Sequence, residues 1–299
     1  MKVLLTGATG FLGHYIESHL PEEVITLGRG IKNTIQADLA KEIPKLPEID
    51  MIVHNAGLAH TVPKTEKEKE EFFRVNLGGT KNLITGIDRL TNKPHAIVFI
   101  SSVAVYGKDF GSLISEKQKP NPQTPYAISK WEAEQLLEKY CEKNGIGLTI
   151  LRLPLVAGAR KVPGNFGAMI KAIKKGYYFR INGLSVRKSM VLAEDVGKLI
   201  PTLYNKSGVF NLTDGVNPSL GDLESYISGY YKKRIYTVPL SLVKFACAFG
   251  NRIRGFPIDS YKLEKLSSSL TFDDARAREV LDWKPSPVIG NLDLENFES

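Results

Sequence analysis

The first half of the chain alternates short apolar runs with longer segments in which apolar residues recur at helical spacing. The apolar runs predict strands near residues 2–6, 24–27, 34–37, 50–54, 95–101 and 147–153. The periodic segments between them predict helices near residues 11–19, 66–90 and 125–143. Strands that alternate with helices favour a parallel sheet with helices on both faces. We therefore predict an α/β fold built on a doubly wound parallel sheet.

A glycine turn follows the first predicted strand and leads directly into the first predicted helix. Its sequence is TGATGFLG at positions 6–13, with the spacing G-x-x-G-x-x-G. A helix N-terminus presents free N–H groups and a positive dipole end, so this arrangement predicts a cradle for a pyrophosphate. We expect Gly7 to permit the tight turn, Gly10 to let a pyrophosphate approach the backbone, and Gly13 to let the helix pack close to the strand. The sequence therefore predicts a Rossmann-like dinucleotide-binding domain.

Two further motifs end predicted strands of the same sheet. HNAG (54–57) lies at the end of the predicted strand 50–54, and SSVAVYG (101–107) lies at the end of the predicted strand 95–101. Ligands of open parallel sheets bind at the carboxyl ends of the strands. The glycine turn and these two motifs should therefore meet in one crevice.

The pattern becomes less regular after Gly158. A turn at 163–167 that is rich in glycine and proline, and the aromatic run 177–179, indicate the start of a smaller lobe. Residues 188–203 suggest a strand and helix that return to the main domain, and residues 208–213 begin the rest of the lobe. The predicted domains are 1–158 with 187–207 for the dinucleotide, and 159–186 with 208–299 for the substrate.

The motifs together resemble the short-chain dehydrogenase/reductase superfamily in its extended branch, the NAD-dependent epimerase/dehydratase family, which acts on nucleotide sugars. Nearly the whole chain follows the family's order, and the nearest resemblance is to bacterial UDP-N-acetylhexosamine 4-ketoreductases and 4-epimerases. The matching segments are TGATGFLG, DMIVHNAG (50–57), VNLGGTKNL (75–83), FISSVAVYG (99–107), TPYAISKWEAE (124–134), ILRLPLVAG (150–158) and FDDARAREVLDWKP (272–285).

Tyr126 and Lys130 lie on one face of a predicted helix. The phenol of tyrosine has a pKa of about 10, and a neighbouring ammonium and an oxidised nicotinamide both favour the phenolate. Such a tyrosine can exchange a proton with a sugar oxygen while the cofactor exchanges a hydride. The same spacing recurs at Tyr261 and Lys265, but only the first pair follows a strand-end motif. The resemblance implies catalytic roles for Ser102, Tyr126 and Lys130.

The end of the second predicted strand bears on the choice of cofactor. NAD-binding relatives place an acid there that bonds the ribose 2′-OH, whereas this chain has Gly28 followed by Arg29. Because arginine can accept a 2′-phosphate, we expect NADP, with NAD as the alternative. The resemblance places Asp38 at the adenine. The other residues expected at the cofactor are Gly7, Gly10, Phe11, Leu12, Gly13, Leu39, Asn55, Ala56, Gly57, Tyr126 and Lys130.

The resemblance also implies contacts to a nucleotide-diphosphate sugar, with a UDP-sugar expected. The basic pair Arg187 and Lys188 lies where the family contacts the diphosphate, and either residue could do so, because lysine binds phosphate as a point charge and arginine as a fork. The remaining expected contacts are His60, Ser102, Asn165 and Arg254. The five histidines lack the spacing of metal ligands, so we predict no metal.

Composition adds little to this picture. With 42% apolar and 24% charged residues, the chain is an ordinary globular protein. Cys141 and Cys247 are expected to be buried thiols in a reducing cytoplasm. The net charge of +8 comes without a recognition motif for nucleic acid, so a solvated surface and anionic small ligands account for it. A first strand at residue 2 and a late apolar stretch too short for a bilayer predict a cytoplasmic protein with no membrane partner.

These observations predict NAD(P)-dependent hydride transfer at C4 of the sugar, in the direction of 4-keto-sugar reduction for bacterial surface-polysaccharide synthesis. A UDP-sugar 4-epimerase with tightly bound NAD is the first alternative. A non-catalytic dinucleotide-binding protein is the second, although such proteins typically lose the catalytic tyrosine or lysine. By resemblance, helices 66–90 and 125–143 should pair two subunits into a homodimer.

Overall fold

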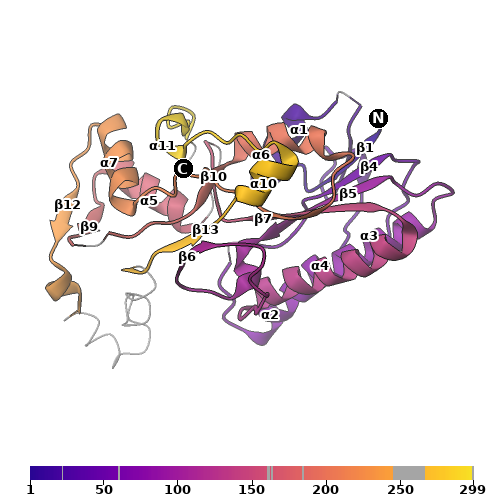
Figure 1. Ribbon diagram of the computed structural model, residues 1–299, viewed down its shortest axis with the longest axis horizontal. Coiled ribbons are helices and arrows are strands. Elements are labelled where there is room, and N and C mark those ends of the chain that lie inside the picture. The colour runs from indigo at the N-terminus through magenta and orange to yellow at the C-terminus, as the bar shows by residue number, and fades with distance from the viewer. Residues whose placement is uncertain are drawn as a thin grey trace.

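The computed structural model describes residues 1–21, 23–59, 61–159, 162, 164–183, 185–244 and 267–297. Its central element is a seven-stranded parallel sheet with the order β11-β7-β5-β4-β1-β2-β3 (Figure 1). These strands are β1 (Val3–Thr6), β2 (Ile25–Gly28), β3 (Ile35–Gln36), β4 (Met51–His54), β5 (Ala96–Ser102), β7 (Gly147–Leu153) and β11 (Gly208–Asn211). The chain winds outward in both directions from β1, and such a reversal opens a crevice at the carboxyl ends of β1 and β4. The predicted fold class is confirmed.

Helices cover both faces of the sheet (Figure 1). One face carries α1 (Phe11–His19), α6 (Ala193–Leu199), the 3₁₀ turn η3 (Ile200–Leu203) and α10 (Ala275–Leu281); the other carries α2 (Glu66–Phe72), α3 (Gly79–Asp88) and α4 (Pro125–Asn144). Leu4 and Leu5 are adjacent in β1 yet enter different apolar clusters, Leu5 with Ile16 and Leu4 with Leu137. Side chains alternate across a strand, so each face of the sheet has its own core.

The predicted helix at 66–90 is one helical run with a change of pitch inside it. Thr65 and Glu68 form a capping box at its start. Between α2 and α3 the backbone follows a π-helix, η1 (Phe73–Gly78), which contains Asn76. π-Segments inside helices often lie at functional sites.

A smaller lobe extends from one end of the sheet, at the left of Figure 1. Its helices are α5 (Gly164–Lys175), α7 (Leu220–Tyr230) and α11 (Val288–Asn291), which share a third apolar cluster. Three two-stranded parallel sheets complete the described structure: β8 (Leu155–Ala157) with β10 (Met190–Leu192), β9 (Phe179–Ile181) with β12 (Tyr236–Val238), and β6 (Gly111–Ile114) with β13 (Leu270–Phe272). A 3₁₀ turn, η2 (Val103–Tyr106), follows β5.

Two segments lie elsewhere than the sequence pattern predicts. Residues 208–213 were expected in the smaller lobe, but β11 pairs with β7 as an edge strand of the central sheet. The expected return strand, β10, pairs with β8 outside that sheet. Trp283, after α10, is buried in the core of the main sheet. Period-two apolar patterning does not say which sheet a short strand joins, because that depends on long-range packing. The domain boundaries themselves remain a prediction.

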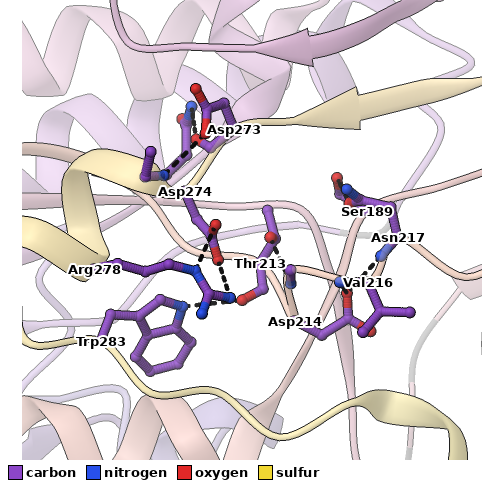
Figure 2. A network of polar contacts seen from close by, with 12 residues as sticks. Ser189, Thr213, Asp214, Val216, Asn217, Asp273, Asp274, Arg278 and Trp283 are labelled. Atoms are coloured by element: carbon purple, nitrogen blue, oxygen red, sulfur yellow. Dashed lines mark hydrogen bonds and ion pairs between the residues drawn. The ribbon is translucent and has the colours of Figure 1, made fainter.

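Polar contacts fasten the end of β11 to the C-terminal segment (Figure 2). Buried Asp214 accepts hydrogen bonds from the backbone N–H groups of Val216, Asn217 and Val288. The indole Nε1 of Trp283 donates to the Thr213 carbonyl oxygen over 2.9 Å. The C-terminal segment therefore belongs to the folded body and ties the two parts of the molecule together. None of the helices in the described ranges combines the length and apolarity needed to span a bilayer.

Candidate active site

A cavity of about 640 Å³ opens at the carboxyl ends of the sheet strands. The glycine turn, the ends of β2, β4 and β5, the start of α4 and the start of α5 line it. The three strand-end motifs of the sequence do meet in one crevice. Twelve of the thirteen residues expected at the cofactor line this cavity: Gly7, Gly10, Phe11, Leu12, Arg29, Asp38, Leu39, Asn55, Ala56, Gly57, Tyr126 and Lys130.

The glycine turn has the shape that a dinucleotide pyrophosphate needs. Gly7 has a φ of +73°, and a Cβ atom there would lie 2.8 Å from the Cα atom of Ala56. Gly13 does not line the cavity. A Cβ atom on it would overlap the carbonyl oxygen of Gly7, so the lack of a side chain at Gly13 lets α1 approach the turn. Gly10 caps α1 without any side-chain hydrogen bond, which leaves the first N–H groups of the helix for an anion. These residues therefore fit a dinucleotide.

His54 is part of a buried hydrogen-bonded chain that fixes the loop after β4. Thr6 Oγ1 accepts from the N–H groups of Asn55 and Ala56 and lies 2.9 Å from His54 Nδ1. The Thr6 hydroxyl therefore donates a hydrogen bond to Nδ1, and Nε2 donates one to Thr80 Oγ1 over 3.0 Å. Burial, with a smaller effect of the Lys130 charge, lowers the His54 pKa to about 3. His54 is thus a neutral packing residue that positions Asn55 and Ala56.

Asn76 connects the loop after β4 to helix α4. Its Oδ1 accepts from the Leu58 N–H over 2.7 Å, and its Nδ2 donates to the Leu58 carbonyl and to Ser129 Oγ. Ser129 Oγ in turn donates to the backbone carbonyl oxygen of Tyr126. Asn76 thus links the loop after β4 to helix α4, two parts of the chain that line the cavity.

Ser102, Tyr126 and Lys130 all line the cavity, and Tyr126 is hydrogen-bonded with Ser102. Burial raises the pKa of the Tyr126 phenol, and its hydrogen bond with Ser102 partly offsets that rise. The lowering of the Tyr126 pKa by Lys130 together with an oxidised nicotinamide stays a prediction. Lys130 is 5% exposed, and its Nζ lies 4.2 Å from the centroid of the Phe99 ring. Burial lowers the Lys130 pKa to about 8, against a smaller opposing effect of Glu134.

A buried ion pair beneath these residues was not predicted from the sequence. Arg152 Nη2 lies 2.6 Å from Glu134 Oε2, and both side chains are buried. Ser101 Oγ donates to Glu134, whereas Ser102 faces Tyr126. Adjacent strand residues point to opposite sides, so the two serines bond to different residues of α4. Two features of the sequence could have indicated this ion pair: an arginine inside the mostly apolar strand 147–153, and an acid one helical turn after Lys130.

The cavity lining holds more charge than the sequence motifs indicated. Arg29 and Asp38 both line the cavity, and so do Glu71 and Arg74. Arg74 Nε donates to Glu71 Oε2 over 2.7 Å, and its Nη1 donates to the Ala40 carbonyl oxygen. No strand-end or glycine motif contains Arg74, because the helical run 66–88 brings it to the cavity from a distant part of the sequence.

The expected substrate residues are only partly assembled. Asn165 lines the cavity from the first turn of α5. Arg187 is exposed and donates from Nη1 to the Asn217 carbonyl oxygen. Lys188 forms an isolated β-bridge with Leu270 through the backbone. Neither residue is among the described residues that line the cavity. Which of them contacts a diphosphate stays an open prediction. His60, Arg254, Cys247, Tyr261 and Lys265 lie outside the described residues.

Comparison with known proteins agrees with this geometry. The profile of the NAD dependent epimerase/dehydratase family matches residues 3–212. The chain is 26% identical to UDP-glucose 4-epimerase from Vibrio cholerae, over 96% of this chain and 92% of that protein. It is 29% identical to GDP-6-deoxy-D-mannose reductase from Pseudomonas aeruginosa, over 50% of this chain and 51% of that protein.

Among solved structures, that of RMD from Pseudomonas aeruginosa complexed with NADPH superposes with a TM-score of 0.74 at 20% identity and covers 100% of both chains. This likeness shows a shared fold over the whole length. The residues that match the family, 3–212, include the glycine turn and the Tyr126–Lys130 pair. The chain is a member of the NAD-dependent epimerase/dehydratase family and an NAD(P)-dependent enzyme of the extended short-chain dehydrogenase/reductase group.

Proposed function

We propose that this enzyme reduces the 4-keto group of a nucleotide-diphosphate sugar with NADPH. The observation that carries the proposal is the joint presence of Ser102, Tyr126 and Lys130 at a cavity that is also lined by Arg29, which follows Gly28 at the end of β2, where NAD-dependent relatives have an acid. A dinucleotide 2′-phosphate is a dianion that arginine can hold in a bidentate fashion, whereas an acid at that position would repel it.

The cofactor-binding residues have separate tasks in this proposal. The N–H groups at the start of α1 and the bare backbone of Gly7 and Gly10 hold the pyrophosphate. Arg29 holds the 2′-phosphate, and Asp38 contacts the adenine. Lys130 holds the nicotinamide ribose. A bound nicotinamide supplies the hydride that reaches C4 of the sugar.

Proton delivery belongs to Tyr126 and Ser102. A tyrosine phenol is protonated at neutral pH, and burial favours that form further, so Tyr126 holds the proton that ketone reduction requires. As the hydride arrives at C4, the carbonyl oxygen gains charge and takes the Tyr126 proton. Ser102 donates a hydrogen bond to the same oxygen, and the Lys130 ammonium stabilises the phenolate that remains. The product is a sugar hydroxyl at C4.

A 4-epimerase is the alternative, favoured by the Vibrio cholerae relative. An epimerase returns the hydride to the same sugar and therefore retains one NAD through a closed cycle, whereas a net reductase needs exchangeable NADPH. Two matches from P. aeruginosa support a net reductase: one relative is named a reductase, and one structure was solved with NADPH. The cytoplasmic role in surface-polysaccharide synthesis and the UDP-linked substrate belong to the same proposal.

The proposal includes a homodimer. The helical run 66–88 and α4 lie side by side on one face of the sheet and would form a four-helix contact between subunits. Light scattering at micromolar protein concentration tests this; a monomer would contradict it.

Denaturation of the purified protein, followed by mass spectrometry of released ligands, tests the reaction type. A reductase should release no stoichiometric NAD, and a separate sample of undenatured enzyme should bind NADPH more tightly than NADH. Stoichiometric NAD together with a UDP-hexosamine would favour the epimerase.

A further inference from the structure

The excess positive charge of this chain is concentrated in two segments. Residues 159–193 and 225–258 contain 14 lysines and arginines and neither aspartate nor glutamate. The remainder of the chain has 26 basic residues against 32 acidic ones. By sequence, the two segments therefore carry a net charge of +14 and the remainder of the chain, called here the negative body, a net charge of −6.

The fold brings these two acid-free segments together. Strand β9 comes from the first and β12 from the second, and they pair in parallel with Phe179 opposite Tyr236. The two rings lie 5.8 Å apart between centroids. On the chain just before the strands, a Cβ atom on Gly176 would lie 3.9 Å from Lys233 Cδ. In Figure 1 this small sheet lies at the far end of the smaller lobe, away from the central sheet.

Aromatic side chains on this sheet are exposed beside the basic ones. Tyr177, Phe179 and Tyr236 are each between 50% and 59% exposed. Lys175, Lys233 and Arg234 are also exposed, and the Arg234 guanidinium lies 5.8 Å from the Tyr236 ring centroid. We call these six residues the aromatic–basic patch. A soluble surface rarely clusters exposed aromatic rings in this way without a binding partner.

We propose that the aromatic–basic patch docks the enzyme onto an anionic lipid surface. Lysine and arginine are attracted to acidic headgroups, and aromatic rings partition into the boundary between headgroups and acyl chains. A flat lipid surface touches only this end of the molecule and leaves the negative body in solvent. A long nucleic acid would also meet the negative body, and a second copy would bring like charges together. The proposal goes beyond the proposed enzymatic function and does not depend on it.

The test is flotation of the full-length protein with vesicles of phosphatidylcholine, with and without phosphatidylglycerol. Wild-type protein should float only with the anionic vesicles and less at high salt, because salt screens surface charges. The variant K175E/K233E/R234E should bind at least about tenfold more weakly, since each charge near the surface contributes to attraction. K45E/K117E/K119E makes the same change in net charge on exposed residues elsewhere and should bind within about twofold of wild type.

A second variant removes apolar contact without changing charge. Phe179→Ser with Tyr236→Ser should weaken vesicle binding and leave NADPH binding and the thermal unfolding midpoint close to wild type. Three results would overturn the proposal: no flotation with anionic vesicles, equal loss in both charge variants, or patch-dependent binding of single-stranded RNA without vesicle binding. Loss confined to the patch variants, in protein that still binds NADPH, supports it.

Discussion

Asn33 lies directly over Gly28 at the end of β2. A Cβ atom on Gly28 would be 2.9 Å from both Oδ1 and Nδ2 of the Asn33 amide. Asn33 is buried, and its Nδ2 donates to the Gly30 carbonyl oxygen over 2.8 Å. The amide therefore occupies the space in which an acidic side chain at position 28 would begin. The Asn33 side chain therefore disfavours the ribose-binding acid of NAD-dependent relatives.

This relationship predicts that an acid alone will not convert the cofactor preference. Gly28→Asp should weaken NADPH binding by charge repulsion and gain little affinity for NADH, because Asn33 blocks the carboxylate. Gly28→Asp with Asn33→Gly should bind NADH more tightly than the single variant does. Fluorescence titration with both dinucleotides measures this. Equal NADH affinity in the single and double variants would contradict the steric argument.

Tyr126→Phe removes the hydroxyl that carries the proton. We expect turnover to fall by about 10²–10⁴-fold, the usual contribution of general acid catalysis, with NADPH affinity close to wild type. Tyr261→Phe, from the second pair with the same spacing, is the control and should remain active. Near-normal turnover of Tyr126→Phe would remove Tyr126 from the mechanism.

His54 should make the enzyme sensitive to acid. Its pKa is about 3 in the folded state and about 6.5 in the unfolded chain, so the unfolded chain binds an extra proton between these values. The free energy of unfolding therefore falls as pH drops below 6.5, by up to about 1.4 kcal/mol per pH unit from this group. Urea unfolding of His54→Gln should show a shallower decline between pH 6.5 and pH 4 than wild type. Parallel slopes would refute a buried neutral histidine.

Removing one partner of the Glu134–Arg152 pair should be worse than removing both. Glu134→Gln leaves a guanidinium buried without a counter-ion, which costs about 3–5 kcal/mol of unfolding free energy. Glu134→Gln with Arg152→Leu should recover most of that loss. Denaturant unfolding of both variants measures the difference. If the double variant is as unstable as the single one, charge burial is not the cause.

Much of the nucleotide-binding half could be predicted because its signals are local. The glycine turn, the HNAG and SSVAVYG strand ends and the start of α4 each depend on a few neighbouring residues, and parallel strands bring such ends together. Helix α1 has the predicted limits of residues 11–19, since its apolar spacing is regular.

The rest depends on contacts between distant segments. The pairing of β11 with β7 is decided by the edge of the sheet that is left open, which no local pattern in 208–213 reveals. The ion pair of Glu134 and Arg152 joins two different elements, so neither residue alone indicates it in the sequence. The raised pKa of Tyr126 likewise follows from burial, whereas sequence spacing suggested only its charged neighbour.

The most direct test of the central claim uses NADPH that carries deuterium at the transferable position on C4 of its nicotinamide ring. The enzyme is mixed with this NADPH and a UDP-4-keto-6-deoxy-N-acetylhexosamine. We predict oxidation of NADPH in equal amount to sugar reduced, with deuterium at C4 of the product sugar. No oxidation of NADPH, together with interconversion of UDP-hexosamine C4 epimers by enzyme carrying its own NAD, would contradict the reductase and establish the epimerase.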